Sequence, residues 1–496
     1  MPTQPNIVLI MTDQHRADVC AREGYPLDTT PFMDSLAAEG VWFNRAYTCS
    51  PTCAPARVSM LTGRFPSATR VRTNHNVPDA TYSRDMIDVL REAGYATAMC
   101  GKNHSHLTED RVDHWFPLGH AAGHRRPGRT AQEEAFDQYL ASLGHRADFH
   151  AAPFPVECQG PARAVADAQQ WVRSVKDRPL FLWLTFAEPH NPYQVPEPYF
   201  DMFPPDSLPP VRAGVEAIDR KGFKWQWTKW QGRTGFQDYD RQLPRARSNY
   251  FGMLRLIDDQ VKRFVEFLDA EGLREDTLIV FVADHGDFVG EYGLVRKGPE
   301  VPECLMRVPM FVNGPGIAGG AGPHPAHVSI VDIFPTLCEM IGAAMPDGVQ
   351  GRSLWPLLTG GDYPAEEFAS VYGEQGFGGL HYTADDDRDP GEEGAMRPGK
   401  GFDCLNSWTQ SGTMRMLRKG DWKLAFDMQG RGQVYNLAAD PAELEDLYGR
   451  PEVADIQREL LADLLAWTLR AADPLPLPRT RYAMKTDPRN WWARYR

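Results

Sequence analysis

A cysteine and an arginine four positions apart have the clearest chemical potential in the chain. The sequence reads Cys53-Ala54-Pro55-Ala56-Arg57 and continues to Leu61-Thr62-Gly63. A cysteine can supply a nucleophile and a guanidinium can bind an anion, so the pair suits an enzyme that cleaves anionic esters. A thiol phosphatase would need the arginine six positions after the cysteine, where this chain has Ser59. The spacing therefore disfavours a thiol phosphatase, and the simpler alternative is a buried structural thiol.

Two pairs of residues could hold a metal ion. Asp13-Gln14 follows the apolar run 6–11, and Asp284-His285 follows the apolar run 277–282. Carboxylate and amide oxygens with one imidazole suit a single divalent cation. Asp is also an ordinary turn residue, so each pair alone would indicate little.

Other polar residues also stand at the expected ends of strands. Lys102 and His104 occur in Gly101-Lys102-Asn103-His104, and His190 occurs in Glu188-Pro189-His190. Lys297 comes 13 residues after Asp284, and Asn74 comes 21 residues after Cys53. Cationic, imidazole and amide groups of this kind can bind an oxyanion or transfer a proton. Considered alone, each of these residues is more simply a solvated loop residue. Arg296, next to Lys297, is expected to be a surface residue. The neighbouring His75 and Asn76 leave the Asn74 assignment open by a position or two.

Together these motifs resemble the formylglycine-dependent sulfatase family of the alkaline-phosphatase superfamily. The complete pattern from Cys53 to Gly63 matches the signature at which the family oxidises its cysteine to formylglycine. Gln14 and His285 depart from the commonest Asp-Asp and Asp-Asn versions, and look more like the choline-sulfatase and phosphonate-monoester-hydrolase branches. With closing segments near Gly420-Asp421-Trp422 and Val434-Tyr435-Asn436, the resemblance spans about residues 6–450.

The resemblance implies a role for each residue. A maturation enzyme converts Cys53 to formylglycine. The hydrate of this aldehyde offers one hydroxyl for attack on sulfur and a second for expelling sulfate. One divalent cation binds through Asp13, Gln14, residue 53, Asp284 and His285; calcium is our first expectation, and manganese or magnesium stay open. Arg57 and Lys102 steady the nucleophile, and His104 assists sulfate release. His190 protonates the leaving oxygen. The substrate is bound by four residues: Asn74, Lys102, His190 and Lys297.

The elements that must position these residues alternate between strand and helix. Apolar runs predict strands at 6–11, 96–100, 180–186, 277–282 and 308–312. Capping residues and helical spacing predict helices at 30–40, 84–93, 162–176, 247–271 and 331–341. This order predicts a mostly parallel sheet covered by helices, in which ligands bind beyond the carboxyl ends of strands. Asp13, His190 and Asp284 are expected at such ends.

Past residue 365 the pattern changes to a smaller α+β unit. Short strands are expected at 370–374, 414–418, 422–426 and 433–436, followed by a helix at 453–471. We therefore predict a catalytic unit over 1–365 and a C-terminal unit over 366–496. Three stretches, 105–160, 191–245 and 375–411, are predicted as irregular walls of a substrate pocket or as contacts between subunits. We expect the tryptophans of 224–230 to anchor the second stretch, and the tail 489–496 to dock on this chain or on another subunit.

Composition limits the alternatives. The 496 residues include 53 Lys and Arg against 66 Asp and Glu, a net charge of −13, which disfavours nucleic acid as a partner. No signal-type or membrane-length apolar segment is evident, so we expect a cytoplasmic protein without membrane contact. Eight scattered cysteines, with no CxxC pair, are expected to be reduced thiols.

These observations predict hydrolysis of small aryl or alkyl sulfate esters. The nearest rival is a phosphonate monoester or phosphodiester hydrolase with the same nucleophile; Lys102 and His104 argue for sulfate, because that branch tends to carry hydroxyl side chains there. A non-catalytic anion-binding protein would be expected to have lost a site residue, and none is missing. A two-zinc phosphatase would need more His and Asp ligands than the motifs supply.

Overall fold

The computed structural model describes residues 4–120, 128–175, 178–235, 238–320, 322–378, 381, 383, 411–472 and 489–493. Its main element is an eight-stranded sheet with the strand order β5-β4-β6-β1-β7-β8-β2-β9. The strands pair in parallel except where β8 meets β7 and β2. The bounds are β1 Asn6–Thr12, β2 Val41–Phe43, β4 Ala96–Gly101, β5 His114–Pro117, β6 Leu180–Thr185, β7 Thr277–Ala283, β8 Met310–Asn313 and β9 Pro323–His324.

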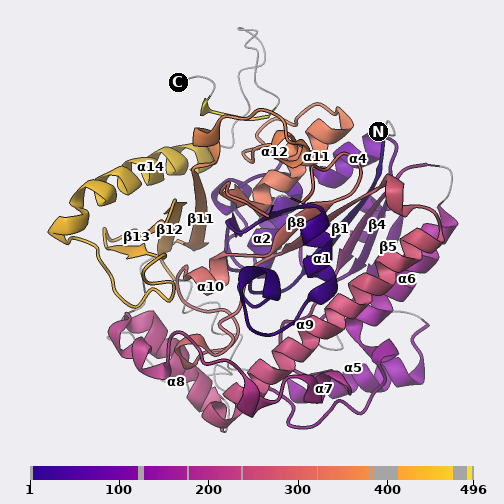
Figure 1. Cartoon of the computed structure of the whole chain (residues 1–496), viewed down its shortest axis with the longest axis horizontal. Helices are drawn as coiled ribbons and strands as arrows, with labels where there is room; N and C mark the ends of the chain where they lie inside the picture. The colour runs from indigo at the N-terminus through magenta and orange to yellow at the C-terminus, as the bar shows by residue number, and fades with distance from the viewer. Residues whose placement is uncertain are drawn as a thin grey trace.

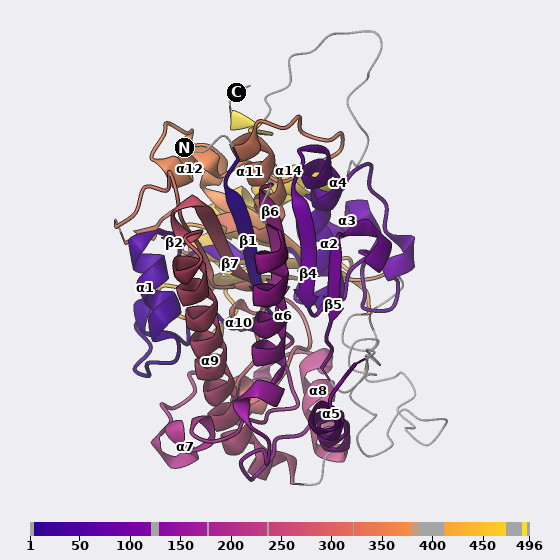
Figure 2. The ribbon, with the colours of Figure 1, turned by 90° about the vertical axis from the view of Figure 1, so that its right-hand side faces the viewer.

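Helices cover both faces of this sheet, as Figures 1 and 2 show. Along β1, Val8 and Ile10 face one apolar cluster, while Ile7, Leu9 and Met11 face the other. Alternate side chains of a strand point to opposite faces, so an unbroken apolar run is what a strand buried on both sides requires. The first cluster includes residues of α1, α6 and α9, and the second includes residues of α2, α4, α11, α12 and α14.

The helices have the following bounds: α1 Pro31–Glu39, α2 Cys53–Thr62, α3 Pro66–Thr69, α4 Met86–Glu92, α5 Ala131–Leu143, α6 Gly160–Ser174, α7 Tyr199–Met202, α8 Phe223–Gly235, α9 Tyr239–Ala270, α10 Glu303–Met306, α11 Ile333–Ile341, α12 Trp355–Thr359 and α14 Ala454–Ala472.

A second, antiparallel sheet has the order β11-β12-β13-β14. Its bounds are β11 Ser370–Gly376, β12 Thr413–Lys419, β13 Trp422–Asp427 and β14 Gly432–Asn436; a further two-stranded sheet joins β3 Ala46–Tyr47 to β10 Val328–Ser329. The edge strand β11 packs against the loop before α2, where Glu374 N–H donates to the Cys49 carbonyl over 2.8 Å. The small sheet therefore supports the segment that leads to Cys53.

The expected fold class is confirmed, with a large mostly parallel sheet, helices on both faces and a small antiparallel sheet near the C-terminus. The division at residue 365 stays a prediction. Two of the stretches expected to be irregular contain regular elements: β5 and α5 lie within 105–160, and α7, α8 and the start of α9 lie within 191–245. Trp225 is 2% exposed and packs on Phe288 and Tyr292, so it anchors α8.

Other expectations concern the tail, the thiols and the membrane. In the described part of the tail, Trp491 is buried and its indole N–H donates to the Ser353 carbonyl, so this part docks on its own chain. The seven described cysteines are free thiols; Cys404 and most of 375–411 lie outside the described residues. Among the helices described, none combines the length and apolar character needed to span a bilayer.

Candidate active site

The sheet brings the three predicted strand ends together. β1 lies between β6 and β7, so the residues that follow these strands share one edge. Asp13 N–H donates to the Glu188 carbonyl, and Asp284 N–H donates to the Thr12 carbonyl, over 3.2 and 3.1 Å. Asp13, His190 and Asp284 are therefore neighbours, as expected for the carboxyl edge of a parallel sheet.

Cys53 is the first residue of α2, whose ten residues are all buried. The sequence patterns did not predict this helix, although Thr52 at its start and Gly63 just past its end are residue types typical of helix caps. Asn74 accepts a hydrogen bond from Ala54 N–H over 3.0 Å. Asn76 instead organises its own loop through Arg72 N–H and the Arg70 carbonyl. Of the asparagines considered, Asn74 is thus the one that reaches the helix, whose N-terminus favours negative charge.

Four buried side chains form a cluster able to hold a cation. Asp13, Cys53, Asp284 and His285 place one ligand atom each so that all four lie within 4.8 Å of one another. The Cys53 sulfur is 3.1 Å from His285 Nε2 and 3.5 Å from Asp13 Oδ1. His285 Nδ1 lies 2.8 Å from the Gly286 carbonyl, which keeps the proton on Nδ1 and leaves the Nε2 lone pair facing the cluster. This donor set fits a divalent cation.

Arg57 and Lys102 flank the two carboxylates. Arg57 Nε donates to Asp284 Oδ2 over 2.8 Å, and Arg57 Nη2 lies 3.6 Å from Asp13 Oδ2. A second nitrogen, Nη1, donates to the Lys102 carbonyl and to Thr185 Oγ1. The Lys102 ammonium forms an ion pair with Asp13 Oδ2. Because these groups are buried, the arrangement fixes the residues around Cys53 in one geometry.

Lys297 lies between the Cys53 side chain and His190. Its Nζ lies 3.0 Å from the Cys53 sulfur, 3.1 Å from Gln14 Oε1 and 3.5 Å from His190 Nε2. His190 Nδ1 lies 2.7 Å from the Asn191 carbonyl, so Nε2 is the ring nitrogen that faces the site. An ammonium group, a thiol and an imidazole thus meet at one point.

The electrostatic environment follows from burial and from the crowding of cations. Burial raises the pKa of the Cys53 thiol and lowers the pKa of the Lys102 ammonium well below its usual value. Burial, together with His120 and Lys297, lowers the pKa of His190 well below the ordinary value of 6.5. For Asp284, burial would raise the pKa, but His285 and Arg57 hold it well below its usual value.

Three residues near the site had not been singled out from the sequence. Asp287, in the same segment as His285, is fully buried and accepts hydrogen bonds from Gln14 and Tyr193. His120 stacks on His190 with ring centroids 3.7 Å apart, and its Nε2 lies 3.8 Å from Asp13 Oδ2. Glu188 lies beside Gly160, and burial raises its pKa to about 7. The Asp-His-Gly-Asp segment could have indicated Asp287; no comparable pattern marks His120.

His104 was predicted as a site residue, and Arg296 was expected at the surface. His104 is partly buried with a φ of 45°, and its Nδ1 makes no hydrogen bond within the described part of the chain. Burial, together with the nearby cations Lys102 and Arg57, lowers the pKa of His104 well below its usual value. Arg296, expected at the surface, is only 4% exposed, which corrects that expectation: its backbone N–H donates to Asp287 Oδ1, which draws the segment before Lys297 into the protein.

Comparisons with known proteins show which proteins the chain is similar to. A family model described as sulfatase matches residues 5–343. The chain is 29% identical over 484 residues to an arylsulfatase of Clostridium perfringens (strain 13 / Type A), covering 90% of this chain and 91% of that protein. It is 28% identical over 501 residues to a choline-sulfatase of Rhizobium meliloti (strain 1021), covering 95% and 88%. The fold resembles the crystal structure of a phosphonate monoester hydrolase of Agrobacterium radiobacter, with a TM-score of 0.76, 23% identity, and coverage of 94% of this chain and 96% of that one.

Proposed function

Because the chain belongs to the sulfatase family, we propose that it hydrolyses aryl or small alkyl sulfate monoesters with a formylglycine made from Cys53 and one divalent cation. One observation carries the proposal: Lys297 Nζ lies 3.0 Å from the Cys53 sulfur and 3.5 Å from His190 Nε2. The nucleophile position, an anion-binding cation and a proton donor for the leaving group are thus adjacent, as ester cleavage requires.

Asp13, Gln14, Asp284 and His285 would hold the cation together with residue 53. A bound divalent cation supplies positive charge that favours the ionised nucleophile and neutralises substrate oxygens. Arg57, bound to Asp284, keeps that carboxylate in place. Calcium remains our first choice, because carboxylate and amide oxygens predominate, and manganese or magnesium remain alternatives.

The hydrated aldehyde of residue 53 would supply both the attacking oxygen and the proton whose loss releases sulfate. Lys102, paired with Asp13, steadies that residue, and His104, which burial and its cationic neighbours keep neutral, is assigned as the base that takes the proton. Lys297 and Asn74 bind the sulfonate oxygens. Lys102 and His190 extend the same pocket, so the substrate is held from both sides of the nucleophile.

His190 is assigned to protonation of the leaving oxygen. Because Nδ1 is bonded to the Asn191 carbonyl, the proton must be delivered from Nε2. Burial and Lys297 oppose the charged imidazole in the free enzyme. An anionic substrate beside Nε2 adds negative charge and favours the protonated imidazole, so substrate binding would prepare His190 to donate its proton.

A phosphonate monoester or phosphodiester hydrolase is the second candidate. It is favoured by Gln14 and His285 among the proposed cation ligands, because these residue types look like those of that branch. Sulfate and phosphonate groups are also both tetrahedral anions. Lys102 and His104 favour sulfate, because two further cationic or imidazole groups surround the anion. The dedicated maturation enzyme and the cytoplasmic location remain predictions of the same proposal.

One preparation can test both candidates. The peptide that contains residue 53 is first analysed by mass spectrometry for conversion of the CH2–SH group to an aldehyde. Hydrolysis of an aryl sulfate and of the matching aryl phosphonate monoester is then measured with that preparation. We expect the aldehyde and a higher kcat/KM for the sulfate. Preference for the phosphonate would select the second candidate, and turnover by fully unconverted protein would reject both.

A further inference from the structure

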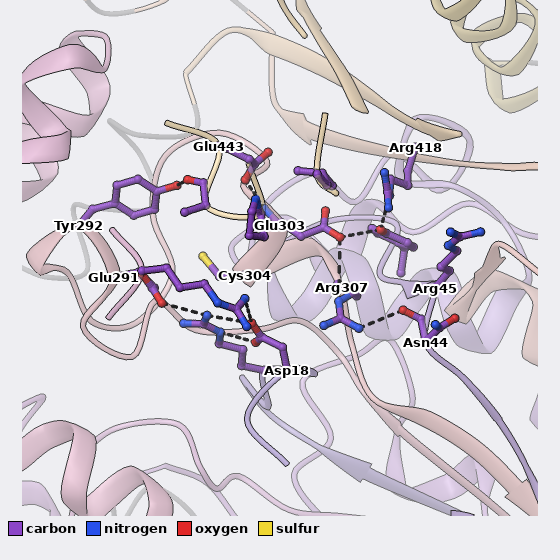
Figure 3. Close-up of a pocket in the computed structure, with 16 residues that line it drawn as sticks. Asp18, Asn44, Arg45, Glu291, Tyr292, Glu303, Cys304, Arg307, Arg418 and Glu443 are labelled. Atoms are coloured by element: carbon purple, nitrogen blue, oxygen red, sulfur yellow. Dashed lines mark hydrogen bonds and ion pairs between the residues drawn. The ribbon is translucent and has the colours of Figure 1, made fainter. Parts of the chain in front are cut away.

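A polar cavity lies between the main body and the small antiparallel sheet. Its volume is about 240 Å3, and none of its lining residues belongs to the candidate active site. Figure 3 shows Arg45 and Asn44 on the side of the cavity away from Glu291 and Tyr292, with Arg307 and Arg418 near them. Asn44 and Arg45 connect β2 to β3, and Arg418 belongs to β12, so body and C-terminal sheet both form the wall.

The carboxylates of this wall are already paired with cations. Asp18 and Glu291 bind Arg16, with contacts of 2.5 and 3.0 Å. Glu303 and Glu443 both bind Lys423, with contacts of 3.4 and 2.8 Å. The acidic part of the wall therefore has little capacity left for a cationic ligand.

Two of the five arginines that line the cavity, Arg45 and Arg418, lie beside the same carboxylate. Arg45 and Arg418 share the carboxylate of Asp421, at 3.2 and 4.0 Å, and that side chain is 53% exposed. Arg418 is only 7% exposed, and its Nε donates to the Tyr47 hydroxyl over 3.0 Å. Its Nη1 is buried and has no acceptor among the residues that the structure describes. A buried guanidinium nitrogen without an acceptor costs free energy, which a bound oxygen would recover.

We propose that this cavity is a second anion site, in which Arg45 and Arg418 bind a small molecule through its oxyanion group. Two neighbouring guanidiniums with free N–H groups match the oxygens of a sulfate, phosphate or carboxylate. The volume is several times the roughly 30 Å3 that a water molecule occupies in the liquid, so the anion can carry an organic substituent. Residues of the body and of the C-terminal sheet both line the site, so a bound ligand would stabilise the contact between these two parts. The proposal does not rest on the chemistry at Cys53.

The test uses the full chain with Lys297→Met, which removes one of the groups proposed to bind sulfonate in the active site. Sulfate is titrated at constant ionic strength, by calorimetry and by the thermal midpoint, since a ligand of the folded state raises stability. We expect saturable binding that Arg45→Met or Arg418→Met weakens by roughly tenfold or more. Arg458→Met is the matched control: it removes one charge from an exposed site on α14 and should leave binding unchanged.

Arg45→Met keeps the test decisive if Arg418→Met does not fold, because Arg45 contacts only an exposed carboxylate among the partners described for it. Inorganic sulfate and a monosaccharide sulfate are compared, to separate a free anion from a substituted one. Binding of either that depends on Arg45 supports the site. The proposal is overturned if neither binds to the Lys297→Met protein, or if both bind equally well after Arg45→Met.

Discussion

Asp287 fixes which end of the Gln14 side chain faces the candidate cation site. The Gln14 amide nitrogen donates to Asp287 Oδ2 over 2.8 Å, and its oxygen lies 3.1 Å from Lys297 Nζ. A carboxylate can only accept hydrogen bonds, so it selects the nitrogen and turns the oxygen, which can bind a cation, toward the cluster. Gln14 also has a φ of 62°, uncommon for a residue with a side chain and frequent at functional sites.

Asp287→Asn should therefore weaken cation binding. The introduced amide can present either its oxygen or its nitrogen to Gln14, so the preferred orientation is lost. We expect the affinity for calcium to fall by about 10- to 100-fold, the range seen when groups behind metal ligands are replaced. Calorimetric titration of the metal-free protein measures this directly.

Asp427→Asn is the matched control for that substitution. Asp427 is also buried, and it accepts a hydrogen bond from the backbone N–H two residues ahead, as Asp287 does. The control should bind the cation like the unmodified protein. Equal affinities for all three proteins would contradict the orienting role of Asp287.

Cys53→Ala should abolish turnover and leave the fold intact. The side chain is small and fully buried at the start of α2, so its truncation removes few contacts. Cys49→Ala is the control, because Cys49 is equally buried and four residues away but its side chain has no role in the proposed reaction. Initial rates and circular dichroism are measured for both. Substantial turnover by Cys53→Ala would refute the mechanism.

His190→Ala should affect poor leaving groups most. A nitrophenolate leaves without protonation, whereas an alkoxide needs a proton. We expect a loss of kcat of roughly 10²- to 10⁴-fold for an alkyl sulfate and a much smaller loss for a nitrophenyl sulfate. Parallel assays of the two esters give the ratio; an equal loss for both would assign His190 to binding instead.

Asp258 should make stability depend on pH. Its two carboxylate oxygens accept the N–H groups of Phe32 and Met33 at the start of α1, and burial raises its pKa to about 7. Between about pH 4 and about pH 7 the unfolded chain has lost this proton while the folded chain keeps it. The free energy of unfolding should therefore fall as the pH rises, by up to roughly 1.4 kcal/mol per unit.

Asp258→Asn carries no titrating group and should lack this part of the slope. Urea unfolding of both proteins at about pH 5 and about pH 8 gives the difference. The stability of the unmodified protein relative to the variant should be lower at the higher pH. A constant difference between the two proteins would show that Asp258 titrates normally.

Much of this site could be predicted because strand ends are readable in a sequence. The runs that became β1, β6 and β7 are apolar throughout, so the residues after them had to meet at one edge. His120 could not be found in this way, because it reaches His190 through tertiary packing that leaves no periodic signal. Helix α8 was missed for a related reason: Trp225 is held by Phe288 and Tyr292, which are distant in sequence.

The contact between Glu374 and the Cys49 carbonyl has a consequence for the timing of synthesis. The loop before α2 is completed by a strand that the ribosome makes more than three hundred residues later. In the finished fold Cys53 has no exposed surface. Under the proposed function, the enzyme that oxidises this thiol would have to act on a nascent or still unfolded chain, and a chain that folded before oxidation would stay inactive.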